Sequence, residues 1–236
     1  MINTPLAPAV PVAECAASLI VALDRRIAFH DRHVRAGEWL QAEQWPVGPL
    51  QGRTLGLVGF GQVARIVMQR LSGFEFNVLV HDPFVTAETV ASAGATAVLL
   101  DELLAQADFI SLHCPLNDST RHLIDERALG LMRRTAFVVT TSRGDVVDER
   151  ALAVALQNGT IAGAALDVYE KEPLPADSPL CQLENVVLMP HTSSHTQQTP
   201  DLFRRLGVDS IIALSEGRWP LSCVNRNAVK PKLNLC

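Results

Sequence analysis

Three side chains in the second half of the sequence have types that can transfer a proton or bind an anion: Arg143, Glu172 and His191. A histidine gives or takes a proton near neutral pH, and a carboxylate beside it orients the ring and favours its charged form. An arginine offers a planar fork of donors to a carboxylate or a carbonyl oxygen. Each residue lies just past the expected carboxyl end of a strand, where ligands bind in open α/β sheets. The pattern therefore indicates an acid–base site at one edge of a sheet.

Each of these residues also has a simpler interpretation when it is considered alone. Arg143 can be a surface ion-pair residue, Glu172 can belong to a Glu-Pro turn, and His191 can be a buried, hydrogen-bonded histidine. Glu170 competes with Glu172 as the partner of the histidine. Only the joint pattern favours catalysis.

A glycine turn with the pattern Gly-x-Gly-x-x-Ala stands between an expected strand and an expected helix. Gly59 permits the tight turn, and Gly61 lacks a side chain, so the backbone can approach a pyrophosphate closely. Ala64 replaces the third glycine of the usual pattern and is still small enough for close helix–strand packing. The amides of Gln62 and Val63 then open the helix, whose N-terminus favours an anion. The turn therefore predicts a site for the phosphates of a dinucleotide.

Asp82 ends the next expected strand, about 20 residues past the glycines, where an acidic residue binds the ribose hydroxyls of a dinucleotide. A carboxylate there would repel a 2′-phosphate, and no Arg or Lys lies between Asp82 and Ser92 to receive one. The sequence therefore predicts NAD rather than NADP as the cofactor. The alternative is a glycine turn in another doubly wound protein, with Asp82 as a loop cap.

Short apolar strands alternate with helices through most of the chain, which predicts a parallel sheet covered on both faces. The expected strands are 54–58, 77–81, 96–99, 109–112, 136–140, 162–166 and 186–188. The expected helices are 12–35, 62–71, 87–93, 101–106, 125–131, 149–158 and 201–216. The predicted fold class is α/β, a Rossmann-type doubly wound parallel sheet with helices on both faces, followed by a C-terminal helix and tail.

Composition and charge restrict the partners and the compartment of the protein. The 236 residues carry a net charge of −5, which gives no general attraction to nucleic acid or to an anionic membrane surface. The apolar stretch 6–23 contains two prolines and a glutamate, so we expect neither a signal peptide nor a membrane span. Five widely spaced cysteines without a CxxC motif indicate reduced thiols and a cytoplasmic protein. The spacings of His81, His113 and His195 match no usual metal site, so no metal is expected.

The glycine turn and the segments 141–149, 165–173 and 189–194 together resemble the D-isomer-specific 2-hydroxyacid dehydrogenases. The resemblance extends over nearly the whole chain, and its ordered motifs match at intervals typical of the family. It implies an NAD-dependent oxidoreductase that transfers a hydride between NAD(H) and a small 2-keto or 2-hydroxy acid.

The resemblance also implies roles for single residues. Arg143, Glu172 and His191 would form the catalytic trio, in which Arg143 binds the substrate and His191 is the acid in reduction and the base in oxidation. Glu172 is preferred to Glu170 because the family motif has its acid immediately before the proline. Neither assignment follows from the spacing alone.

Further cofactor contacts follow from the resemblance. Cys114 would line the adenosine side, although a buried apolar thiol is its alternative role. Asp167 would bind the nicotinamide carboxamide. The small side chains directly before Arg143 and those shortly after His191 would lie near the same group. The complete predicted set of cofactor contacts is Gly59, Gly61, Gln62, Val63, Asp82, Cys114, Thr141, Ser142, Arg143, Asp167, His191, Ser193 and Ser194.

Members of this family normally begin with a separate lid domain, and we expect most of it to be missing from this sequence. Residues 1–10 would be its remnant, 11–195 the NAD-binding domain, and 196–236 a C-terminal helix and tail that pack on the lid. An open cleft neither excludes water nor fixes a substrate. Two functions therefore stay open: a dehydrogenase, or an NAD(H)-binding regulatory or inactive module without turnover.

The resemblance implies a homodimer, because the family dimerises through its NAD domain. Ala13, Ala16 and Ala17 give the first helix a face for close packing, and Trp39 and Trp45 could anchor a partner. A core helix within one monomer is the competing interpretation.

Overall fold

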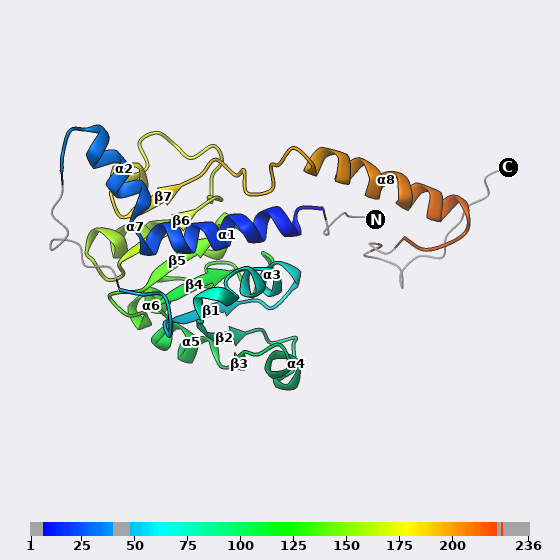
Figure 1. The fold of residues 1–236 in the computed structure, drawn as a ribbon, viewed down its shortest axis with the longest axis horizontal. Coiled ribbons are helices and arrows are strands. Elements are labelled where there is room, and N and C mark those ends of the chain that lie inside the picture. Colours follow the sequence, from blue (N-terminus) through cyan, green and yellow to red (C-terminus); the bar gives the residue numbers. More distant parts are fainter. Residues whose placement is uncertain (1–6, 40–47, 221–222, 224–236) are drawn as a thin grey trace. The chain divides into compact units, whose positions relative to one another are not determined.

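The computed structural model describes residues 7–39, 48–220 and 223, and its centre is a seven-stranded sheet (Figure 1). The strands are β1 (Thr54–Val58), β2 (Asn77–His81), β3 (Thr96–Ala97), β4 (Phe109–Leu112), β5 (Phe137–Thr140), β6 (Gly163–Leu166) and β7 (Val186–Leu188). Their order is β3-β2-β1-β4-β5-β6-β7, and every pairing is parallel. The order reverses between β1 and β4, as in a doubly wound nucleotide-binding fold. The predicted fold class is confirmed.

Helices connect the strands and cover both faces of the sheet. They are α1 (Ala9–Asp24), α2 (Ile27–Arg35), α3 (Gln62–Arg70), α4 (Ala87–Ser92), α5 (Leu100–Gln106), α6 (Glu126–Leu131), α7 (Glu149–Gln157) and α8 (Thr199–Ser215), with short 3-10 segments η2 (Ser72–Phe74), η3 (Gly144–Val146) and η4 (Pro179–Gln182). Side chains of Thr86, Asp125 and Asp148 accept the amide three residues later and so start α4, α6 and α7. These caps also fix where the preceding loops end.

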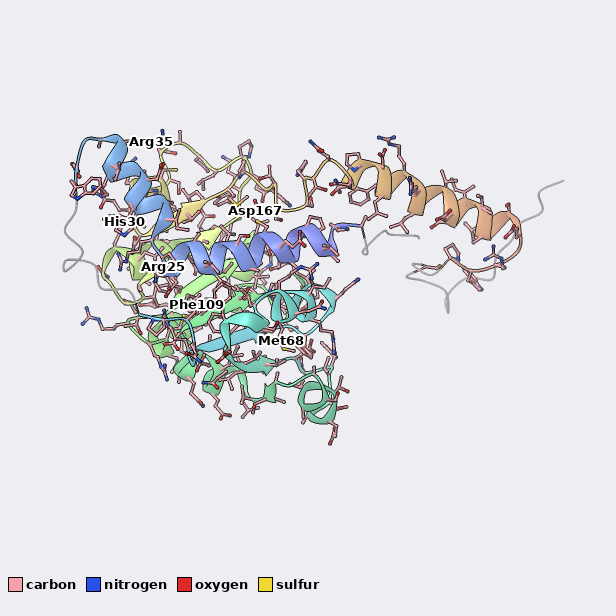
Figure 2. The ribbon with its side chains drawn as sticks, viewed as in Figure 1. Arg25, His30, Arg35, Met68, Phe109 and Asp167 are labelled. Carbon is pink, nitrogen blue, oxygen red and sulfur yellow. The ribbon has the colours of Figure 1, made fainter. Side chains whose placement is uncertain are left out.

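Each face of the sheet has its own apolar core, because successive strand residues point to opposite sides. On one face, Leu55 and Leu57 of β1 pack with residues of α1, α3 and α4. On the other face, Ile110 of β4 packs with residues of α5, α6 and α7. The rings of Phe109 and Phe137 stack with centroids 5.5 Å apart, so they join β4 and β5 inside the first core (Figure 2 labels Phe109).

The N-terminal region forms two helices, so the prediction of one long helix over 12–35 was wrong. Arg26 takes a left-handed conformation with φ 50° and interrupts the helix. Asp24, the last residue of α1, is 4% exposed and pairs with Arg53 at the start of β1. Helical spacing continues on both sides of the break, so a periodicity analysis does not detect it.

The small residues of α1 pack inside the chain. Ala13, Ala16 and Ala17 are buried in the core on the α1 side of the sheet. The competing interpretation of a core helix therefore holds for these three alanines, while Trp45 lies outside the described residues.

Contacts divide the chain into two compact units. One spans Ala13–Ser193 and contains the whole sheet, and the other combines Met1–Val12 with Ser194–Cys236 and contains α8. Within the described ranges, no helix is both long enough and apolar enough to cross a membrane.

Candidate active site

The residues singled out in the sequence follow the carboxyl ends of six parallel strands. The glycine turn follows β1, Asp82 follows β2 and Cys114 follows β4. Arg143 follows β5, and the loops with Glu172 and His191 follow β6 and β7. The strand order reverses between β1 and β4, and ligands of open α/β sheets bind at the carboxyl edge beside such a reversal.

The glycine turn has the geometry that a pyrophosphate requires. Gly59 has φ 89°, and a Cβ added to it would lie 2.8 Å from the backbone nitrogen of Cys114. Gly61 is the N-cap of α3 without a side-chain cap, and a Cβ added to it would meet no atom within 4 Å. The amides of Gln62 and Val63 open this helix, where backbone donors lack intrahelical acceptors. The positive φ of Gly59, the open space at Gly61 and the helix N-terminus together fit an approaching phosphate.

Asp82 is held beside the glycine turn by two backbone amides. Its Oδ2 accepts from the amide of Phe60 at 2.7 Å, and its Oδ1 accepts from the amide of Phe84 at 2.9 Å. A carboxylate has about four acceptor sites, so both oxygens can still accept ribose hydroxyls. Asp82 therefore caps the loop, as the alternative interpretation had it, and remains available to a dinucleotide.

Cys114 is 8% exposed and packs against Gly59. Burial raises the pKa of its thiol to about 11, and the negative charge of Asp82 acts in the same direction. The thiol is therefore neutral and apolar at physiological pH. Its burial agrees with both roles that the sequence allowed, and its contact with adenosine stays a prediction.

His191 and Glu172 form a hydrogen-bonded pair in which imidazole Nδ1 lies 2.7 Å from Oε2 of the carboxylate. The hydrogen bond from His191 lowers the pKa of Glu172, and the amide of Tyr169 and the charge of Arg143 add to this effect. Because Nδ1 donates to the carboxylate, Nε2 is left for proton exchange. His191 has φ 55°, a left-handed conformation that is uncommon for a residue with a side chain and clusters at functional sites.

Arg143 lies within electrostatic reach of this pair, since its charge lowers the pKa of Glu172. Its Nη1 donates to the carbonyl of Ser142 at 2.6 Å. Gly144 follows, and a Cβ added there would lie 1.9 Å from the carbonyl carbon of Tyr169. The glycine directly after Arg143 is the signal in the sequence for this close approach.

Asp167, which Figure 2 labels, is completely buried directly after β6, where it anchors the loop of His191. Its Oδ1 accepts from the amide of Thr192 at 2.8 Å, and its Oδ2 accepts from the amide of Ser193 at 2.9 Å. This anchoring could not be predicted from the sequence, because the two amides lie 25 and 26 residues from Asp167 and belong to the next loop of the sheet. The predicted contact of Asp167 with a carboxamide stays a prediction, and Ser194 belongs to the other compact unit.

Glu170, the competing acid, has other partners. Its Oε1 accepts from the amide of Glu149 at 3.0 Å and lies 3.0 Å from Nε2 of His122. Glu149 in turn accepts from the amide of Glu170 at 3.2 Å. Glu172 is therefore the carboxylate that pairs with His191.

Two hydroxyl groups precede Arg143. Thr141 is 7% exposed, and its Oγ1 is buried without a hydrogen-bond partner among the residues that the structure describes. Ser142 Oγ lies 3.5 Å from Oγ1 of Thr140. A buried polar atom without a partner calls for a ligand group or water, which fits the predicted place of Thr141 beside a nicotinamide.

The histidines considered as metal ligands have other surroundings. His81 Nδ1 lies 3.2 Å from the carbonyl of Val98, and His113 Nε2 lies 2.9 Å from Oγ of Ser111. Desolvation by burial lowers the pKa of His113 to about 4. Across the described part of the chain, no group of three or more His, Cys, Asp or Glu residues could hold a metal ion.

The fold and this site define a dehydrogenase-type nucleotide-binding domain with an acid–base pair. Residues 17–193 match the sequence model described as "D-isomer specific 2-hydroxyacid dehydrogenase, NAD binding domain". The glyoxylate reductase of Korarchaeum cryptofilum is 42% identical over 97% of this chain and 70% of its own length. The crystal structure of D-lactate dehydrogenase with NAD+ from Lactobacillus jensenii has a TM-score of 0.87 at 28% identity, over 95% of this chain and 71% of that chain. A glyoxylate reductase structure from Paecilomyes thermophila has a TM-score of 0.85 at 34% identity, over 96% of this chain and 68% of that chain.

The chain belongs to the D-isomer specific 2-hydroxyacid dehydrogenase family. It is an NAD-dependent oxidoreductase of this type, and NAD is its cofactor, as the resemblance predicted. The chain spans about 70% of the length of the Korarchaeum relative.

Proposed function

We propose that this chain interconverts small 2-keto and 2-hydroxy acids with NAD(H), using His191 as the acid–base residue. The observation that carries the proposal is the 2.7 Å contact between His191 Nδ1 and Glu172 Oε2, at the same sheet edge as the glycine turn. Relatives named glyoxylate reductase and glyoxylate/hydroxypyruvate reductase support glyoxylate and hydroxypyruvate as the first substrates to test.

NADH, when bound, supplies the hydride for the carbonyl carbon. His191 donates a proton from Nε2 to the carbonyl oxygen, and Glu172 stabilises the charged imidazole before the transfer. Arg143 offers parallel donors to the substrate carboxylate or carbonyl oxygen. In the oxidative direction, neutral His191 accepts the hydroxyl proton.

The residues of this chain can hold the cofactor in three parts. The glycine turn and the first amides of α3 bind the pyrophosphate, and Asp82 binds the ribose hydroxyls. Cys114 lines the adenosine side. The residues proposed near the nicotinamide are Thr141, Ser142, Arg143, Asp167, His191, Ser193 and Ser194.

The test begins with a fluorescence titration of NADH, followed by assays of glyoxylate and hydroxypyruvate reduction. We expect NADH binding, and turnover that His191→Ala abolishes while NADH affinity stays within about twofold. His30→Asn on α2 is the matched control and should keep wild-type turnover. Absence of NADH binding would refute the proposal. Binding without turnover would instead support the regulatory or inactive module.

We also propose a homodimer. Exposed apolar side chains on and after α2 support it: Ile27 is 54% exposed, Val34 is 55% exposed and Trp39 is 83% exposed. Analytical ultracentrifugation should find a dimer that Trp39→Ala weakens. A monomer at every concentration tested would contradict this proposal.

The cytoplasmic location and the domain limits are proposals as well. The free cysteines Cys15, Cys114 and Cys181 support a reducing compartment. The division between Ser193 and Ser194 supports a boundary near residue 195 between the NAD domain 11–195 and the C-terminal segment 196–236.

A further inference from the structure

We propose that Tyr169 is a positioning residue that fixes Glu172 and the loop of His191 relative to each other. This inference rests on the proposed acid–base roles of that pair. Tyr169 is the single tyrosine of the chain, it is 7% exposed, and it lies between Asp167 and Glu172 on the loop after β6. Its backbone and its phenol contact different parts of the site.

The backbone of Tyr169 holds the carboxylate. Its amide donates to Oε1 of Glu172 at 3.1 Å, while Oε2 of the same carboxylate lies 2.7 Å from Nδ1 of His191. Both oxygens therefore have a partner, and the plane of the carboxylate is fixed toward the imidazole. A change in the position of residue 169 would rotate the carboxylate away from His191.

The phenol of Tyr169 holds the loop of the histidine. Its oxygen lies 2.8 Å from the carbonyl of Met189 and 3.2 Å from the carbonyl of Leu166. A phenol has one hydrogen to donate, and the shorter distance directs it to Met189, two residues before His191. Leu166 has another donor, because its carbonyl also accepts from the amide of Met189 at 2.8 Å. Loss of the hydroxyl would therefore loosen mainly the segment that leads into His191.

The phenol keeps its hydrogen at neutral pH. Desolvation by burial raises the pKa of Tyr169 to about 12, and nearby negative charges add to this effect. At neutral pH it therefore donates to the Met189 carbonyl and takes no part in proton transfer.

The third contact of Tyr169 involves the loop of Arg143. Gly144 approaches its carbonyl so closely that a Cβ on the glycine would lie 2.0 Å from the carbonyl oxygen. One residue thus borders all three segments of the proposed trio. A tyrosine that only filled the core would need the ring but not the hydroxyl.

Tyr169→Phe separates these two roles, because it keeps the ring and removes only the hydroxyl. We expect kcat for glyoxylate reduction to fall about three- to tenfold, with the Kd for NADH and the KM for glyoxylate within twofold of wild type. Hydrogen exchange should become faster in segment 189–193 and stay unchanged in segment 54–66. Ser111→Ala, which removes a buried hydroxyl on β4, is the matched control and should keep kcat within twofold.

An unchanged kcat in Tyr169→Phe would overturn the inference. If the wild-type chain reduces no 2-keto acid, the proposed function fails, and hydrogen exchange then decides on Tyr169: an unchanged rate in 189–193 overturns its role. If Tyr169→Phe does not fold, 3,5-difluorotyrosine can be incorporated at this single tyrosine without changing its shape. Fluorination makes a phenol more acidic, so glycolate oxidation should decline at a lower alkaline pH than in unlabelled protein. An identical pH profile would overturn the inference.

Discussion

The cofactor half and the acid–base half of the site are built in different ways. In the cofactor half, the glycine turn and Asp82 act through backbone geometry, and Asp82 itself binds the amides of Phe60 and Phe84. In the acid–base half, one side chain binds another, as His191 Nδ1 and Glu172 Oε2 do. Glycines and an acidic residue at fixed offsets define the first half, whereas the second half depends on which loops the sheet brings together.

Because the two halves are built differently, we expect that mutations can reduce cofactor binding and substrate turnover separately. A change in the glycine turn should reduce cofactor affinity first. A change among the loops after β5, β6 and β7 should reduce turnover and leave the cofactor bound.

We expect Arg143→Gln to cause the largest loss of turnover without a loss of cofactor binding. Loss of the charged fork removes the donor proposed for the substrate, so kcat/KM for glyoxylate should fall on the order of a hundredfold, with NADH affinity within twofold. Arg150→Gln, a charge change on α7, is the control and should keep wild-type kcat/KM. Steady-state kinetics together with NADH fluorescence measure both quantities. Equal losses of NADH affinity and kcat/KM would contradict the separation of the two halves.

Gly59→Ala should weaken cofactor binding by the glycine turn. A side chain at φ 89° and 2.8 Å from the Cys114 nitrogen strains the turn, and left-handed backbone costs an ordinary residue about 1–2 kcal/mol. This strain displaces the turn from the conformation that binds the cofactor, so NADH affinity should fall about tenfold. Gly73→Ala is the control, since its added Cβ meets no atom within 4 Å. NADH affinity that is equal in both variants would refute the role of the turn.

The same contrast explains how much could be predicted from the sequence. Strands 54–58, 77–81 and 186–188 have the predicted bounds, because apolar runs between turns identify buried parallel strands. The glycine turn and Asp82 were found because their roles follow from residue type at fixed offsets. The break at Arg26 was not found, because it is a backbone conformation within a continuous helical pattern.

In the acid–base half, the sequence predicted the residues and, through the family motif, one of the contacts between them. The pairing of Glu172 rather than Glu170 with His191 came from the family motif, and periodicity could not have chosen between two acids two residues apart. The anchoring of the His191 loop by Asp167 and the hydroxyl contact of Tyr169 depend on how β6 and β7 lie side by side. Such contacts are a property of the folded sheet.

Asp82→Ser tests the cofactor half at its other end. Removing the carboxylate removes the repulsion of a 2′-phosphate, so the preference for NADH over NADPH should fall about tenfold. Asp101→Ser, which removes an equal charge on α5, should leave the preference unchanged. Competitive fluorescence titrations of the two cofactors measure it. An unchanged preference in Asp82→Ser would mean that another group selects the cofactor.

The pH dependence of stability should reveal His113 in the cofactor half. Its folded pKa of about 4 lies below the ordinary value of 6.5, so between these values the unfolded chain binds a proton that the folded chain does not. The free energy of unfolding should therefore fall as pH decreases from 6.5 to 4. The slope should correspond to the uptake of at most about one proton on unfolding. Denaturant unfolding of His113→Gln should lack this slope, and His30→Gln should retain it. A slope that persists in His113→Gln would assign it to other groups.

The smallest effect is expected from Glu172, in a different pH range. Its folded pKa is lowered from 4.5, mainly by the hydrogen bond from His191, so the contribution of the pair is complete above pH 4.5 and is lost as pH falls through the folded value. Solvent screens the pair, because the side chains of Glu172 and His191 are 36% and 46% exposed. The difference in unfolding midpoint between wild type and Glu172→Gln should therefore shrink as pH falls below 4.5. A difference that stays unchanged below pH 4.5 would contradict the contribution of the Glu172 carboxylate.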